Sequence, residues 1–307
     1  METQQQSSKM NSVCHASYDV WYLPRDQYHE SEYEDGFAPD TSFRNKEMLS
    51  PSRFAVADGV TMAYFSGRWA SMLTKAYVES GENFLEKTSL ETMARSWEEQ
   101  EQSIVQSTYY PNMEIIQILD QKIHVIGGSA TLNGLEINWE EKTYTSFSIG
   151  DSLCFHIRDG KIISENPPLT CDDFGYAPKQ ISTNTFRYKR TSSDDWNPDY
   201  LSGAFELGDT FLLVTDAIAL WLLRPHSEYS QEDKLKDLLF ISSQEEFLEY
   251  MTQERNMDRI EGDDLTVSII RVLPQSSDEE PETSGMCGSI DQSLPGILTL
   301  GDKNERV

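Results

Sequence analysis

Residues 54–59 read Phe-Ala-Val-Ala-Asp-Gly, an apolar run that ends in a carboxylate and a glycine. The same pattern returns at 211–216, where Phe-Leu-Leu-Val-Thr leads to another aspartate. Short continuous apolar runs are typical of strands that are buried on both faces. Asp58 and Asp216 therefore end two buried strands, in surroundings where a bare carboxylate is costly unless something compensates its charge.

The segments around these two strands predict a mixed fold. Apolar residues recur at helical spacing in 69–77 and again in 90–105, which predicts two long amphipathic helices. From 129 to 164 apolar and polar residues alternate, and Asp159-Gly160 is a hairpin turn signal, so this part is expected to form an antiparallel meander.

The last third continues with helices and one strand. Helices are expected at about 217–224, 232–240 and 244–254, and a final strand at 265–272. Strands grouped before and after helices predict layers of antiparallel sheet covered by helices, which is an α+β sandwich.

The composition bounds the domain organisation and the partners. We expect one domain over 1–274, with an insertion or flap at 166–206, and an acidic disordered tail at 275–307. The 307 residues carry 52 acids and 25 bases, a formal net charge of −27, which argues against nucleic acid as a partner. The longest nearly apolar stretch, 211–223, is too short for a membrane span, and the polar start has no secretory signal. A cytoplasmic protein without a membrane partner is expected.

Four places along the chain put acids beside small residues or at strand ends. They are Glu34-Asp35, Asp58, Asp216 and Asp263-Asp264. Converging carboxylates without a basic neighbour in sequence suit Mg²⁺ or Mn²⁺ better than zinc. One such acid alone is more often a turn or cap residue, so the prediction of a metal site depends on the set.

The order of six motifs resembles the metal-dependent serine/threonine protein phosphatases of type 2C, and their bacterial branch in particular. The motifs extend over about 30–272 and are Glu34-Asp35, Val56-Ala57-Asp58-Gly59, Gly127-Gly128-Ser129-Ala130-Thr131, Ile149-Gly150-Asp151-Ser152, Gly208-Asp209 to Thr215-Asp216, and Asp263-Asp264-Leu265-Thr266. The resemblance implies a four-layer sandwich of two central antiparallel β-sheets flanked by α-helices.

The resemblance also implies an enzyme that hydrolyses phosphoserine or phosphothreonine on proteins with two Mn²⁺ or Mg²⁺ ions. In such a centre the ions activate a water, and no covalent intermediate forms. The substrate would be a phosphoprotein, opposed by a serine/threonine kinase in signalling.

Site roles follow from the resemblance residue by residue. Asp58 would bridge both ions, Glu34 and the carbonyl of Gly59 would serve one, and Asp216 and Asp263 the other. Asp35 and Asp264 would complete the catalytic set by orienting bound waters or ligands. Asp151 is assigned only to a turn between strands.

The sequence departs from the family pattern at several positions. Val60 stands where some members have a histidine that protonates the leaving group, and Glu30 stands where many have a phosphate-binding arginine. Arg25, Arg44, Arg53 and Arg68 are substitutes that the sequence does not rank. Val125 and Leu220 occupy two positions of a third ion, so two metals are expected.

These departures keep other readings open. The first alternative is a catalytically weak binding or regulatory module of the same fold, suggested by Val60, Glu30 and the negative charge. The second alternative is a hydrolase of stacked antiparallel sheets with an N-terminal nucleophile. Met1-Glu2-Thr3 argues against it, because it offers no processed Thr, Ser or Cys at a strand start.

Overall fold

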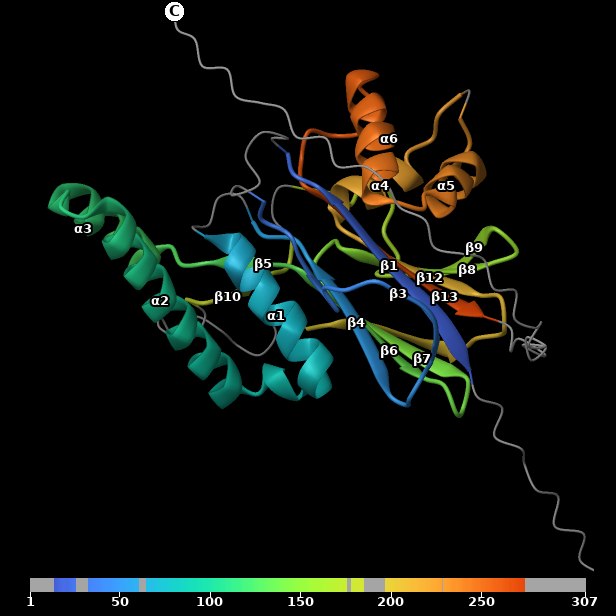
Figure 1. Ribbon diagram of the computed structural model, residues 1–307, viewed down its shortest axis with the longest axis horizontal. Coiled ribbons are helices and arrows are strands. Elements are labelled where there is room, and N and C mark those ends of the chain that lie inside the picture. The colour runs from blue at the N-terminus through green and yellow to red at the C-terminus, as the bar shows by residue number, and fades with distance from the viewer. Residues whose placement is uncertain are drawn as a thin grey trace, which may run out of the picture. The chain divides into compact units, whose positions relative to one another are not determined.

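The computed structural model describes residues 14–25, 33–60, 65–175, 178–184, 197–227 and 229–273. They form two antiparallel sheets with helices on both outer faces (Figure 1). Within these ranges no helix is long and apolar enough to cross a membrane.

The larger sheet contains the strand that ends at Asp216. Its six strands pair antiparallel in the order β3 (Phe43–Glu47), β1 (His15–Leu23), β13 (Leu265–Leu273), β12 (Thr210–Val214), β8 (Leu153–Arg158) and β9 (Lys161–Asn166). The central strand β13 pairs along its full length with β1, from Leu265 opposite Leu23 to Leu273 opposite His15. This pairing brings the acids before β13 and the segment after β1 to one end of the sheet.

The smaller sheet contains the strand that ends at Asp58. Its order is β11 (Asp199–Ala204), β7 (Thr143–Ile149), β6 (Leu132–Asn138), β4 (Ser52–Ala57) and β2 (Gly36–Ala38). A two-stranded pair, β10 (Ile181–Ser182) with β5 (Ser129–Ala130), continues from it, and Gly59 bridges to Ala130.

Helices cover the outer face of each sheet. The described helices are α1 (Ser66–Ser80), the 3₁₀ turn η2 (Gly81–Leu85), α2 (Lys87–Tyr109), α3 (Met113–Val125), α4 (Asp216–Leu223), α5 (Gln231–Phe240) and α6 (Gln244–Asn256). Side-chain caps begin several of them: Asn112 accepts from Ile115 N, and Ser230 and Asp233 form a capping box.

Three hydrophobic clusters separate the four layers. Leu73 and Trp97 pack the first helices on the smaller sheet, Tyr18 and Phe54 lie between the sheets, and Trp221 and Phe247 pack the last helices on the larger sheet. Strand β12 shows how one strand serves two cores. Its alternate residues belong to the cluster between the sheets and the cluster under the helices. The predicted four-layer α+β sandwich is therefore confirmed.

Several details differ from the sequence interpretation. Strands β1, β2 and β3, helix α3 and the 3₁₀ turn η2 are absent from the sequence prediction. The expected meander of 129–164 is divided, because β6 and β7 lie in the smaller sheet and β8 and β9 in the larger one. Gly150, with φ +107°, lies at the crossing, in a backbone conformation that glycine adopts most easily.

The proposed flap of 166–206 also includes regular structure. Strand β11 pairs with β7 from Asp199 opposite Ser148 to Ala204 opposite Thr143, so it is an edge strand of the smaller sheet. The segment 185–196 and the predicted tail lie outside the described residues.

Candidate metal centre

Asp58 lies where β4 leaves the smaller sheet. Its N–H donates to Thr131 Oγ1 at 3.0 Å, and its carbonyl accepts from Thr131 N at 2.8 Å, so its backbone is fixed. Among the described residues no hydrogen bond or ion pair reaches the carboxylate of Asp58. A rigid strand end thus presents a carboxylate to which no described residue donates a hydrogen bond.

Close backbone packing places Glu34 beside Asp58. A Cβ at Gly59 would lie 2.2 Å from the carbonyl oxygen of Glu34, and one at Gly67 would lie 2.5 Å from that of Tyr33. No L side chain fits at either contact without a shift of the backbone. These two glycines therefore let the start of α1 and the end of β4 approach the segment that carries Glu34.

Asp35 is buried and connects the ends of two strands. It accepts hydrogen bonds from Thr215 Oγ1 at 3.0 Å and Thr266 Oγ1 at 2.6 Å. Burial, and then the charges of Asp264 and Asp216, raise its pKa well above the ordinary value. Asp35 thus positions the turn between β12 and α4, where Asp216 lies.

Asp264 fixes the two segments opposite it. One carboxylate oxygen accepts from Arg25 N and the other from Glu34 N, each at 2.6 Å. Burial is the main cause that raises the pKa of Asp264, and the two backbone N–H groups act against it. This carboxylate has its acceptor positions engaged, which suits a positioning role.

Asp216 is the first residue of α4, after the buried strand β12. One of its oxygens accepts from Ala217 N at 2.5 Å. Burial, followed by the charges of Asp151 and Asp263, raises the pKa of Asp216 to about 7. The helix N-terminus favours the anion, yet burial and the neighbouring acids outweigh it.

Asp151 belongs to the same group, although the sequence interpretation gives it only a place in a turn. It is buried, its Oδ1 has no hydrogen-bond partner, and burial raises its pKa to about 6. Ser152 Oγ lies 2.8 Å from Thr131 Oγ1, the same hydroxyl that binds Asp58 N, so Asp151 and Asp58 are held by one local network. The signal is present in the sequence, because Asp151 lies in one of the six motifs and follows the end of a strand.

The acids converge on Asp58. Its pKa is raised well above the ordinary value by burial first and then by the charges of Asp216, Asp35, Asp151 and Asp263. The structure therefore brings together acids from all the segments that the sequence nominated. In the described part of the chain, however, no three His, Cys, Asp or Glu side chains are already arranged closely enough to ligate one ion.

Two guanidinium groups border the acids. Arg25 Nη2 lies 3.3 Å from Glu34 Oε2, and its Nη1 lies 3.8 Å from Asp263 Oδ1. Arg255 donates to three carbonyls, those of Pro24 at 2.9 Å, of Arg25 at 3.5 Å and of Asp263. In the described part of the chain these seven carboxylates outnumber the two guanidinium groups, and hard oxygen donors fit Mg²⁺ or Mn²⁺.

The other candidate arginines lie elsewhere in ion pairs. Arg44 pairs with Asp19, Arg53 with Glu136 at 2.6 Å, and Arg68 with Glu101. Of the four substitutes considered from sequence, Arg25 is thus the one at the acids. Glu30 lies outside the described residues.

The structure also places Val60, Leu220 and Val125, the other positions that depart from the family pattern. Val60 is partly buried and its N–H donates to Ser129 O at 2.9 Å. Leu220 is buried in α4, whereas Val125 is half exposed on α3.

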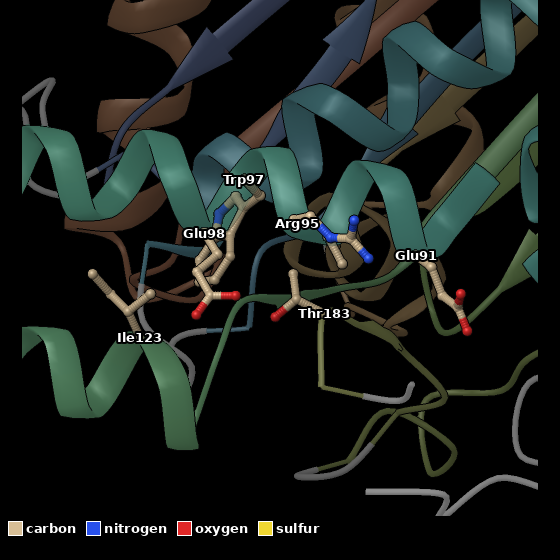
Figure 2. A pocket seen from close by; sticks show the side chains of 7 residues that line it. Glu91, Arg95, Trp97, Glu98, Ile123 and Thr183 are labelled. Carbon is tan, nitrogen blue, oxygen red and sulfur yellow. The ribbon is translucent and has the colours of Figure 1, made fainter. Parts of the chain in front are cut away.

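Two cavities have different relations to the acids. One of about 210 Å³ is lined by Asp151, Pro167, Lys179 and Asp199, among others, and so borders the centre. The other, of about 200 Å³, lies between α2, α3 and Thr183 and includes none of these acids (Figure 2).

Comparisons with known proteins give structural matches only. No family model matches the sequence, and no curated protein matches it. RsbX in complex with magnesium is 17% identical, over 84% of this chain and 96% of that chain, with a TM-score of 0.46. The serine/threonine phosphatase PstP/Ppp of Mycobacterium tuberculosis is 15% identical, over 85% and 100%, with a TM-score of 0.45. The photosystem II phosphatase PBCP is 14% identical, over 84% and 98%, with a TM-score of 0.46. The chain is similar to these three proteins.

Proposed function

We propose that the protein is a metal-dependent serine/threonine protein phosphatase of the type 2C kind. The observation that carries the proposal is the group of acids around Asp58, whose pKa is raised by burial and by the charges of Asp216, Asp35, Asp151 and Asp263. A structural role alone does not account for this arrangement, because partnered carboxylates would stabilise the fold better.

The proposed ligands are those nominated from the motifs, with one addition. Glu34, Asp58 and the carbonyl of Gly59 would hold one ion, and Asp58, Asp216 and Asp263 the other. Asp151 adds a further carboxylate at the same point. When bound, two Mg²⁺ or Mn²⁺ ions supply an activated water and neutralise charge on the phosphoryl group.

The protein's own residues arrange this centre. Asp35 and Asp264 hold the strand ends and the segment of Glu34 through the hydrogen bonds described above. Asp58 and Asp216 stand on rigid elements, which limits the reorganisation that binding requires. No side-chain nucleophile is needed, and water takes the phosphoryl group directly.

Arg25 is proposed to bind the phosphate of the substrate. Its guanidinium lies at Glu34 and Asp263, and its planar fork matches phosphate oxygens. Arg25→Gln is expected to raise KM for a phosphothreonine peptide about tenfold, a loss typical of one charged hydrogen bond, with a smaller change in kcat. Arg53→Gln, at the other end of β4, is the matched control and should leave KM unchanged. An equal rise in both variants would contradict the assignment.

The alternative is a module of the same fold that binds phosphoproteins without turnover, favoured by Val60 in place of a proton donor. Hydrolysis of p-nitrophenyl phosphate separates the two. The enzyme proposal predicts turnover that requires Mn²⁺ and stops with a chelator. Metal binding without turnover would support the alternative.

A further inference from the structure

The helical hairpin of α2 and α3 gathers most of the exposed apolar side chains. Of the fourteen large hydrophobic residues that are exposed in the described part of the chain, eight lie between Ile104 and Ile126. Exposed apolar groups are usually scattered singly, and a concentration on one element is typical of an interaction surface. The hairpin is therefore unlike the rest of the surface.

Helix α3 has two apolar faces, and only one of them is buried against other described residues. Ile116 and Ile123 are buried, and α3 packs on α2 at the edge of the molecule (Figure 1). Ile115, Ile118 and Val125 recur at three- and seven-residue spacing and so share another side of the helix. They are 37%, 48% and 52% exposed. This second face, Ile115, Ile118 and Val125, is called the α3 apolar face.

The surroundings of the α3 apolar face are acidic. From 91 to 126 the chain has two bases, Arg95 and Lys122, against six acids, which are Glu91, Glu98, Glu99, Glu101, Glu114 and Asp120. Glu101 is buried against Arg68, and Glu98 lies 3.0 Å from His124 Nδ1, so the acids still outnumber the cations after these pairs are set aside. A second copy of this chain would bring like charges together on top of a net charge of −27 each. The charge therefore favours a basic partner over a homodimer.

The cavity of about 200 Å³ beside the end of α3 is also lined by both apolar and charged side chains. Its lining combines apolar side chains with two acids and one base, namely Ala94, Trp97 and Ile123 with Glu91, Glu98 and Arg95 (Figure 2). Asn184, which follows the lining residue Thr183, donates to the carbonyl of Val125 at 2.7 Å and so ties this cavity to the end of the α3 apolar face. An apolar lining that includes carboxylates suits the stem and the charged head of a lysine or arginine.

We infer that the α3 apolar face is a docking surface for an amphipathic α-helix of another protein, with an apolar stripe flanked by lysine or arginine. Such helices bind apolar surfaces through anchors at i, i+3, i+4 and i+7. The basic flanks would face the acids of α2 and α3. This inference does not depend on the phosphatase activity.

The test uses a labelled 18-residue peptide of leucine and lysine, with leucine at i, i+3, i+4 and i+7, and fluorescence anisotropy with the full chain. Ile118→Glu should weaken binding at least tenfold, because it removes an apolar anchor. Phe240→Glu, a change of an exposed apolar residue on α5, is the matched control and should leave binding within twofold. Since both variants add a negative charge, binding by charge alone would be unchanged or tighter in both.

Retained binding in Ile118→Glu would therefore overturn the docking surface. A peptide with glutamate in place of lysine should bind at least tenfold more weakly, and equal binding would contradict the basic partner. A wild-type dimer in light scattering that Ile118→Glu dissociates would show that the occupant is a second copy and would overturn the inference. If circular dichroism shows that Ile118→Glu misfolds, Val125→Glu provides the same comparison.

Discussion

Asp35 accepts a 2.6 Å hydrogen bond from the hydroxyl of Thr266, inside the core and at the start of the central strand β13. Through Thr215 the same carboxylate also holds the start of α4. The acids of the candidate centre are thus connected to the fold itself, and changes near them affect stability as well as activity.

Thr266→Val tests this connection. The substitution keeps the shape but removes a donor from a buried carboxylate, which should lower the free energy of unfolding by about 1–3 kcal/mol. Chemical denaturation measures it. Thr145→Val, on an exposed hydroxyl pair of the smaller sheet, is the control and should change stability by less than about 0.5 kcal/mol. A loss of the same size at both positions would remove the special role of Asp35.

The acid centre should give the metal-free protein an unusual pH dependence. Burial raises the pKa of Asp151 to about 6 and of Asp216 to about 7, above the unfolded values. Their contribution is therefore fully present below the unfolded pKa and is lost as the pH rises through the folded pKa, between about 4 and 7. Thermal unfolding with a chelator should show lower stability at pH 8 than at pH 6, and Asp216→Asn should reduce this difference.

Added Mn²⁺ should reverse the trend, because a bound cation stabilises the ionised carboxylates. The melting temperature at pH 8 should rise with Mn²⁺ in the wild type and rise less in Asp216→Asn. A metal response that is equal in both would mean that the ion binds elsewhere.

A second buried charge network lies away from the centre, and it shifts the pKa of its aspartate downward instead of upward. Asp209 is buried, which acts to raise its pKa, but hydrogen bonds from Arg158, Glu206 N and His156 lower the pKa to about 2. Its stabilisation is present above the unfolded pKa and is lost as the pH falls from about 4 to 2. Asp209→Asn should cost about 2 kcal/mol at pH 7 and flatten the acid limb of the stability curve. Asp159→Asn, an exposed change in the nearby turn, should do neither.

Val60 offers a test of the leaving group. No side chain at this position can donate a proton, and a poor leaving group needs that proton most. Val60→His should change the hydrolysis of p-nitrophenyl phosphate little and increase the rate on a phosphothreonine peptide. At matched metal concentrations, equal effects on both substrates would point to packing or metal affinity instead.

Much of the fold could be predicted from residue patterns. The buried strands ending at Asp58 and Asp216 and the two antiparallel sheets follow from apolar runs and alternation, which report burial directly. Helix α3 is harder to interpret because Ile115, Ile118 and Val125 are exposed beside the buried Ile116 and Ile123, so its apolar residues do not report burial. Strand β1 is harder because its mixed polar and aromatic sequence is buried almost throughout by neighbours distant in the chain.

The candidate site, like the fold, could be predicted only in part. The motif order nominates the acids, but the role of Asp151 and the choice of Arg25 require the structure. Arg25 lies nine residues before Glu34, and the hydrogen bonds that Asp264 accepts from the backbone of both segments help to bring the two together. Contacts of this kind depend on tertiary pairing, which spacing in the sequence does not determine.

The most direct test of the central claim is phosphate release from a phosphothreonine peptide by the wild type and by Asp58→Asn, each with the same Mn²⁺ concentration. The account predicts metal-dependent release by the wild type, loss of roughly 100-fold or more in Asp58→Asn, on the order of one lost electrostatic contact in a catalytic centre, and an unchanged circular dichroism spectrum. Release by Asp58→Asn at the wild-type rate would contradict it.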